Sequence, residues 1–189
     1  MFRQLKMLKP SFVTTMIVIV ISLLSIQFLP SFRPVDDIIA ATINLRGPVL
    51  ISQTILLAFV MWQVVSFRKS RALIEVRGKT EVIQKQLIKA MTFEVVLYFL
   101  LFEGAFLLLG YQIFRDGPVV IGVLVLVFRV LLVWFLGLLL ITMYNSSYPA
   151  VIALTVFVSN FLYHFIVEKS FLLVHYSVHY DTLWQAFNN

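Results

Sequence analysis

Three ionisable residues interrupt the apolar stretches of this chain and are the first candidates for chemistry. Glu94 and Glu103 lie in one apolar stretch, and Arg129 lies in the next, within "PVVIGVLVLVFRVLLVWFLGLLLITM". A charge at the centre of a spanning helix costs at least about 2.5–3.5 kcal/mol, so such residues pair or mark a path for ions, protons or substrate. The tight turn "FRDGP" brings Glu103 and Arg129 to similar depths. We therefore predict an intramembrane ion pair between them, either as a structural lock or as a polar site.

Glu94 lies nine residues before Glu103, which places it about half a turn away on the helix. It is therefore not expected to take part in the predicted pair. We expect it near the cytoplasmic interface, where Lys89 or a basic residue of the preceding span can reach it.

The C-terminal stretch "LLVHYSVHYDTLWQAF" contains a weak metal-binding pattern. His175 and His179 are four residues apart, which puts both imidazoles on one face of a helix, as in zinc sites. No third ligand has a fixed spacing, so we expect no metal. The aromatic residues Tyr176, Tyr180 and Trp184 are typical of an interfacial belt.

No motif in the chain predicts catalysis. The chain has no Cys, which excludes disulfides, thiolate metal sites and Cys nucleophiles. It has no Gly-rich phosphate loop, no recognisable Ser/His/Asp motif and no pair of carboxylates on one face. His164 lies among aromatic residues and is expected to be a packed core histidine. We therefore expect neither an enzyme nor a bound cofactor.

Composition places these residues in a membrane protein. Of the 189 residues, 61% are hydrophobic and 13% are charged, against about 25% charged residues in soluble domains. The apolar runs are continuous rather than alternating, which favours spanning helices over a β-barrel. We predict an all-α polytopic integral membrane helix bundle in the cell membrane, forming a single domain over residues 1–189. Its five expected spans are 11–29, 48–67, 92–114, 118–143 and 148–168.

Basic residues set the expected orientation. Ten of the fifteen Lys and Arg residues flank the first two spans on one side: Arg3, Lys6, Lys9, Arg68, Lys69, Arg71, Arg77, Lys79, Lys85 and Lys89. Loops with an excess of Lys and Arg remain in the cytoplasm. We therefore expect a cytoplasmic N-terminus and, with five spans, an outer C-terminus. Because orientation accounts for the basic residues, no nucleic-acid partner is expected.

Residues 68–91 are predicted to form a helical hairpin that projects into the cytoplasm. Apolar residues recur there at spacings of three and four, and "GKTE" from Gly78 predicts a helix end followed by a new start. A helix over 81–114 would be about 50 Å long, whereas the hydrocarbon core is about 30 Å thick. The alternative is that the apolar stripe packs within the hairpin and the charges only orient the chain. The residues expected to face a cytoplasmic protein are Arg71, Leu73, Ile74, Val76, Arg77, Gly78, Ile83 and Leu87.

Two further segments have more than one interpretation. The loop at 30–47 contains "VDDIIAATINL", which can form a short amphipathic helix on the outer interface or a plain connector. The final residues, 169–189, are too polar and aromatic for a sixth span. We expect an amphipathic or re-entrant helix there.

The order of these segments resembles the permease subunits of ABC-2-type exporters. A basic stretch precedes span one, "RKSRALIEVRGKTEVIQKQLIKA" joins spans two and three, and a tight outer turn joins spans three and four. The resemblance is one of topology over residues 1–168. It implies that Arg68 to Ala90 contacts a separate ATPase subunit, with Leu73, Ile74 and Val76 entering a groove on it. The family usually has six spans, whereas this chain has five and a short tail.

The sequence therefore predicts a membrane subunit of a multi-protein transporter whose ATPase is a separate chain. The competing interpretation is a non-transporting accessory or assembly subunit of a larger membrane complex. In that case the hairpin would be a docking site, and Glu103 and Arg129 would form a structural lock. The expected partners are lipid, a cytoplasmic protein and another membrane subunit.

Overall fold

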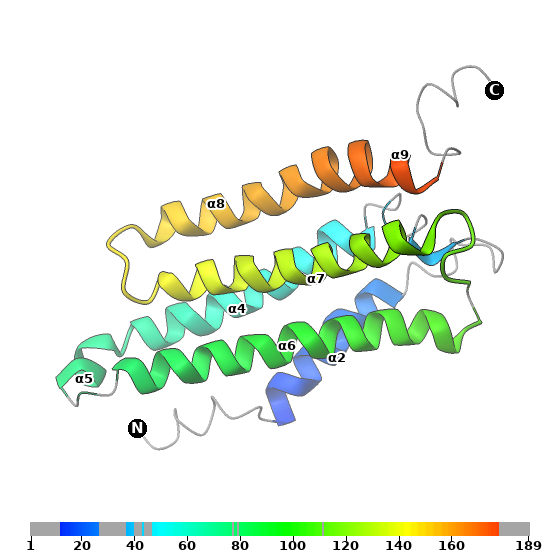
Figure 1. The fold of residues 1–189 in the computed structure, drawn as a ribbon. Helices are drawn as coiled ribbons and strands as arrows, with labels where there is room; N and C mark the ends of the chain where they lie inside the picture. Colours follow the sequence, from blue (N-terminus) through cyan, green and yellow to red (C-terminus); the bar gives the residue numbers. More distant parts are fainter. Residues whose placement is uncertain are drawn as a thin grey trace.

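The described part of the chain is helical, and an isolated bridge between Asp37 and Gln112 is its only β-type pairing. The computed structural model describes residues 12–26, 37–39, 43, 47–76, 78, 80–110 and 112–177. The long helices run side by side as a bundle, and α2 crosses α6 at an angle (Figure 1). With η denoting a π-helix, the elements are α2 Phe12–Ile26, η2 Gly47–Ser52, α4 Gln53–Arg68, α5 Arg71–Val76, α6 Thr80–Leu108, α7 Val119–Thr142, α8 Pro149–Leu162, η3 Tyr163–Leu172 and α9 Leu173–Tyr176.

In the part of the chain that the structure describes, four helical stretches are long and apolar enough to cross a membrane. They are Leu50–Arg68, Thr80–Leu108, Val119–Thr142 and Pro149–Tyr176. This confirms an all-helical chain of the membrane-protein class. The first predicted span, 11–29, is represented by the shorter apolar stretch Val13–Ser25 within α2.

Two predicted boundaries need correction. The helix expected to reach residue 114 ends at Leu108, because Gly110 takes a left-handed φ of +81° and turns the chain. The last span continues beyond its predicted end at 168, through η3 and α9 to Tyr176. Residues 169–176 therefore belong to a helical stretch that is long and apolar enough to cross a membrane, rather than to a separate tail. Residues 178–189 lie outside the described part of the chain.

Helix α7 occupies the centre of the bundle. Helices α4 and α6 pack against one side of it and α8 against the other, while α2 packs mainly on α6. Figure 1 shows α8, η3 and α9, coloured yellow to red, as one continuous outer helix along α7. The main hydrophobic core combines side chains from α2, α4, α6 and α7, including Ile21, Leu57, Met91 and Leu136. The outer helix therefore contributes little to this core, and α7 is its main support.

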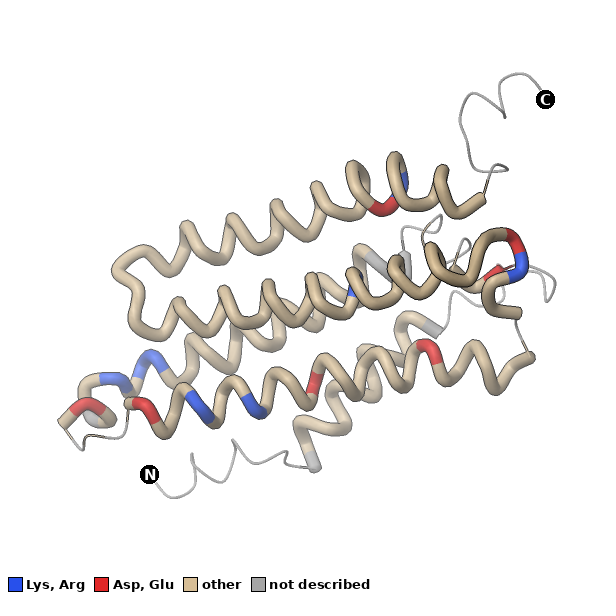
Figure 2. Tube along the Cα trace, in the orientation of Figure 1, with Lys and Arg blue, Asp and Glu red and all other residues tan. Residues whose placement is uncertain are grey.

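Most of the described Lys and Arg residues gather at the end of the bundle where α4 ends and α6 begins (Figure 2). Two of them bond to carbonyl groups that follow α7. Nη1 of Arg68 donates to the carbonyl of Met143 at 2.6 Å, and Nη1 of Arg71 donates to that of Asn145 at 3.3 Å. Carbonyls at a helix end lack intrahelical partners and carry partial negative charge, which cations stabilise. These two arginines therefore fasten α4 and α5 to the end of α7.

Gly78 turns the chain between α5 and α6, at the position that the sequence predicts. Its φ is +61°, and α6 begins two residues later at Thr80, with Glu81 in the first turn. An L side chain in this left-handed region costs about 1–2 kcal/mol, whereas Gly adopts it freely. The turn therefore depends on the residue type at position 78.

At the opposite end, the carboxylate of Asp37 joins three segments. It accepts hydrogen bonds from the backbone N–H of Ile39 at 2.8 Å, the backbone N–H of Asp116 at 2.9 Å and the hydroxyl of Tyr176 at 2.5 Å. Asp37 is fully buried. A Cβ at Gly117 would meet the carbonyl oxygen of Tyr176 at 2.1 Å, so only Gly allows this approach. The described part of the 30–47 loop therefore packs under the α6–α7 turn and against α9.

Replacing Gly78 with Ala should destabilise the chain by about 1 kcal/mol, because an L side chain disfavours a φ of +61°. No atom lies within 4 Å of the added methyl group, so backbone strain alone causes the loss. Gly104→Ala is the matched control: Gly104 lies inside α6 with equally open surroundings, where Ala is favoured by about 1 kcal/mol. Thermal unfolding in detergent measures both variants, and equal effects would contradict the left-handed turn.

Replacing Tyr176 with Phe should destabilise the chain by about 1.5–3 kcal/mol, because it removes a hydrogen bond to a buried carboxylate. Tyr148→Phe is the control, since Tyr148 is 73% exposed and should tolerate the change. Thermal unfolding of both purified variants is the measurement. If Tyr176→Phe costs no more than Tyr148→Phe, the hydroxyl does not fasten α9.

Candidate functional site

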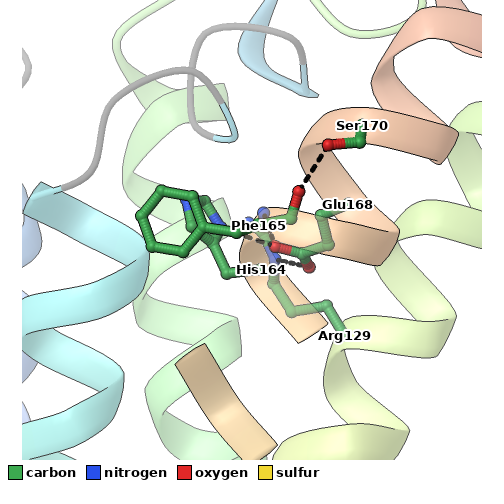
Figure 3. A network of polar contacts seen from close by, with 5 residues as sticks. All are labelled: Arg129, His164, Phe165, Glu168 and Ser170. Atoms are coloured by element: carbon green, nitrogen blue, oxygen red, sulfur yellow. Dashed lines mark hydrogen bonds and ion pairs between the residues drawn. The ribbon is translucent and has the colours of Figure 1, made fainter. Parts of the chain in front are cut away.

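Arg129 and Glu168 form a buried ion pair between α7 and η3 (Figure 3). Nε of Arg129 donates to Oε1 of Glu168 at 2.9 Å, and Nη2 donates to Oε2 at 3.3 Å. Both side chains are 1% exposed. A two-point contact between a guanidinium and a carboxylate fixes geometry as well as charge. The pair therefore joins the outer helix to the centre of the bundle.

His164 contacts the same carboxylate from one turn earlier on the outer helix. Its Nδ1 lies 3.0 Å from Oε2 of Glu168, and the imidazole is buried. The winding here is π-helical, and the hydroxyl of Ser170 donates to the carbonyl of Phe165, five residues earlier, at 2.8 Å (Figure 3). Turns of a π-helix are rare and occur frequently at functional sites. Glu168 is thus held by two side chains within an unusual helical segment.

Glu103 is not the hydrogen-bonded partner of Arg129, which corrects the predicted pair. The guanidinium bonds to Glu168, while Glu103 interacts with it electrostatically. Among the described residues, Oε1 of Glu103 is buried with no hydrogen-bond partner. The prediction compared depths within one helical hairpin. It left out the outer helix, which packs on the other side of α7 and carries a second carboxylate.

A cluster of hydroxyl groups extends the polar contacts across the bundle. The hydroxyl of Tyr98 on α6 lies 2.6 Å from Oγ of Ser52 and 3.2 Å from Oγ of Ser25, which belong to η2 and α2. Tyr98 is fully buried and lies within electrostatic range of Arg129 and Glu103. Through hydrogen bonds and electrostatic interactions, residues of α2, η2, α6, α7 and η3 form what we term the polar layer: Ser25, Ser52, Tyr98, Glu103, Arg129, His164 and Glu168.

Within the described residues, several atoms of the polar layer are buried with no hydrogen-bond partner. They are Nη1 of Arg129, Oε1 of Glu103 and Nε2 of His164. Buried polar atoms are nearly always partnered, and each exception requires a physical reason. An unsatisfied group in hydrocarbon costs several kcal/mol, because no water can bond to it. These three atoms therefore retain the capacity for further hydrogen bonds.

Glu94 forms a separate contact nearer the basic end of α6. Its Oε1 accepts a hydrogen bond from Nε2 of Gln63 on α4, and its Oε2 is buried with no partner among the described residues. The partner of Glu94 is therefore Gln63, and not Lys89 or a basic residue of the preceding span as predicted. Lys89 is exposed, because a separation of five residues places it on a different face of the helix.

Three of the predicted partner-facing residues face the chain's own core instead. Ile74, Ile83 and Leu87 belong to the main hydrophobic core and are at most 6% exposed. The stated alternative is packing within the hairpin, whereas these residues pack in a core that also includes side chains of α2 and α7. Helical spacing defines an apolar face but not what covers it, which is why the sequence could not decide between the two.

The other predicted partner-facing residues differ in exposure. Val76 is 88% exposed, and Gly78 is exposed at the turn. Arg71 is partly exposed and forms an ion pair with Glu75 one turn later. Arg77 and the side chain of Leu73 lie outside what the structure describes.

Over the described part of the chain, no group of three or more His, Asp or Glu residues could hold a metal ion. His175 is exposed, and its Nδ1 donates to the carbonyl of Phe171 at 2.8 Å. His179 lies outside the described residues, as do Tyr180 and Trp184 of the predicted aromatic belt. The site is therefore built from ion pairs and hydroxyl groups.

The sequence contains a signal for the outer-helix side of this site. Asn160, His164 and Glu168 recur every four residues, and all three are buried. A spacing of four places side chains on one face of a helix. Three polar residues on one face of an apolar helix indicate that the face turns toward polar partners. Similar depth of residues in α6 and α7 does not reveal this face, because the outer helix is not adjacent to α6 in the chain.

Comparison with known proteins assigns no family to this geometry. The chain matches no known protein family, no curated protein and no solved structure. Its function therefore has to be argued from the chemistry of the site.

Replacing Arg129 with Met or Glu168 with Gln should destabilise the chain by about 3–5 kcal/mol, because either change leaves a buried group of the pair uncompensated. The double variant R129M/E168Q should recover part of this loss. Chemical unfolding in detergent gives the interaction energy of the pair. If the double variant showed no recovery, the pair would not be the stabilising contact described here.

A second cycle with Glu103→Gln separates the two carboxylates. R129M/E103Q should give a smaller interaction energy than R129M/E168Q, because Glu103 makes no hydrogen bond to the guanidinium. If the interaction energy from R129M/E103Q were larger than that from R129M/E168Q, Glu103 would be the main partner of Arg129, as the sequence predicts.

Proposed function

We propose that this chain is a membrane subunit of a multi-protein transporter that works with an ATPase on a separate chain. The proposal places the N-terminus and residues 68–91 in the cytoplasm, gives the bundle five spans with α2 as the first, and puts the C-terminus outside. The concentration of Lys and Arg at one end of the bundle supports this orientation. The topological resemblance to ABC-2-type export permeases supports the division between a membrane subunit and an ATPase.

The polar layer is the observation that carries the proposal. Ionisable residues deep in spanning helices are costly, and they mark paths for substrates, ions or protons. Arg129, Glu103 and His164 each have a buried atom without a hydrogen-bond partner among the described residues, which leaves them able to bond to a polar substrate or ion. A bundle that served only as an anchor would be as stable, or more so, with apolar residues at these positions.

The tip of the hairpin is the proposed contact with the ATPase. Val76 is a branched apolar side chain that is 88% exposed beside the turn at Gly78. Contiguous exposed apolar patches with a polar rim mark protein interaction sites, and Val76 would be the centre of such a patch in the proposed contact. Ile74, Ile83 and Leu87 are not part of this surface, because they are buried in the core of the chain. The proposed contact is therefore smaller than the apolar stripe that the sequence indicates.

A second candidate is a non-transporting accessory subunit, and an apolar groove between α2 and α4 favours it. The groove has a volume of about 700 Å³, and Val20, Leu24 and Phe59 are among the side chains that line it. A spanning helix of another membrane protein, about 10–12 Å wide, would pack along such a groove through van der Waals contact. In this case Arg129 and Glu168 would only fix the register of the helices.

Photo-crosslinking from position 76 tests the proposed contact. A photoreactive amino acid in place of Val76 should form an adduct with a cytoplasmic protein that contains a phosphate-binding loop, identified by mass spectrometry. Val120 is the matched control, because it is also an exposed valine (71%) but lies at the opposite end of the bundle. No such adduct should form from position 120.

If the ATPase adduct formed from position 120 and not from position 76, the proposed cytoplasmic location of residues 68–91 would be wrong. An adduct with a membrane protein from position 24, in the groove, without any ATPase adduct from position 76, would favour the accessory subunit instead.

A further inference from the structure

Three carboxyl groups of the described spanning helices differ in what surrounds them. Glu168 accepts two hydrogen bonds from the guanidinium of Arg129. Glu103 lies within electrostatic range of Arg129, but its Oε1 is buried with no hydrogen-bond partner. Glu94 bonds to the uncharged amide of Gln63, and its Oε2 is likewise buried and unpartnered in the structure. Only Glu168 therefore has a cation at hydrogen-bond distance.

The charges in the interior of the bundle do not balance if all three of these carboxyl groups are ionised. Arg129 offers one positive charge, which Glu168 already matches. Lys169, the Lys residue of the outer helix, forms no ion pair with a described carboxylate. Ionised Glu94 and Glu103 would then add two negative charges to an apolar bundle. A buried carboxylate without a bonded cation is so costly that it takes up a proton instead.

We propose that Glu94 and Glu103 each bind a proton within the spans, while Glu168 stays ionised. Each carboxylate takes one proton from water to form a neutral carboxyl group and returns it on release. With both protons bound, Arg129 and Glu168 remain as a neutral pair, and the spans carry no uncompensated carboxylate. Arg129 is the charged group that faces Glu103, and the neutral Gln63 faces Glu94.

A hydroxyl group lies between the two proton-binding carboxyls on the same helix. Glu94 and Glu103 are nine residues apart, which is about 14 Å along α6. Tyr98 lies one turn after Glu94, and its buried hydroxyl bonds to Ser25 and Ser52. A hydroxyl can both donate and accept a proton. In the transporter proposed above, this arrangement would provide two proton-binding sites within the membrane subunit. It rests on that proposal only for this role, because proton binding is a property of the purified chain.

Infrared spectroscopy of the purified chain in lipid bilayers tests the proposal, because a protonated carboxyl and a carboxylate absorb in separate bands. At neutral pH the wild-type chain should show a carboxyl band. E94Q and E103Q should each lose about half of this band, and E94Q/E103Q should lose all of it. E81Q is the matched control, since Glu81 lies on the same helix with its side chain 86% exposed. An exposed Glu is ionised at neutral pH, so E81Q should leave the band unchanged.

Two further variants keep the test valid if a Gln variant is unstable. E94D and E103D retain a carboxyl group, so each should shift its half of the band without removing it. Circular dichroism checks the helix content of every variant. If E94Q or E103Q leaves the band area unchanged in a folded chain, the proposal is overturned. The photo-crosslinking test from position 76 does not depend on this result. Proton binding and the transporter assignment can therefore fail separately.

Discussion

One guanidinium inside an apolar bundle governs how the helices around it are placed. Arg129 is 1% exposed, and its charge away from water requires a carboxylate at hydrogen-bond distance. Glu168 meets this requirement only when the outer helix lies along α7 with its polar face inward. Most residues of that helix are exposed or half-buried, so apolar burial alone does little to hold it. Charge pairing therefore positions the outer helix. The same placement brings His164 into the interior of the bundle, where it contacts Glu168.

Both ends of the bundle are closed by charged side chains that bond to backbone groups. Arg68 and Arg71 donate to carbonyls after α7 at the basic end, and Asp37 accepts two backbone N–H groups at the other. Where chains enter or leave a bilayer, backbone groups must find partners within the protein or at the interface. The basic end thus has a structural task in addition to the orientation proposed for it. Counting charges overstates how many of these side chains are available to a lipid headgroup or a protein.

Features with a local signal could be predicted from the sequence, and those that depend on packing could not. Continuous apolar runs indicated the long spanning helices, and Gly78 indicated the turn before α6. Arg129 was identified as a costly charge, but its partner depended on which helix packs against the far side of α7. Asp37 bonds to Asp116, which lies 79 positions later in the sequence, and to Tyr176, which lies 139 positions later. No local sequence pattern can reveal contacts over such separations.

The π-helical winding of η3 sets the angle between the ion pair and the outer end of the same helix. Apart from Leu173, five buried residues of the outer helix are spaced by multiples of four: Val156, Asn160, His164, Glu168 and Tyr176. In an α-helix each step of four drifts by about 40°, so the last of these would lie about 200° around from the first. A π-turn, with its i→i+5 bonds, rotates less per residue and offsets part of this drift. Deleting one residue from η3 could therefore leave a continuous helix and still rotate Tyr176 away from Asp37.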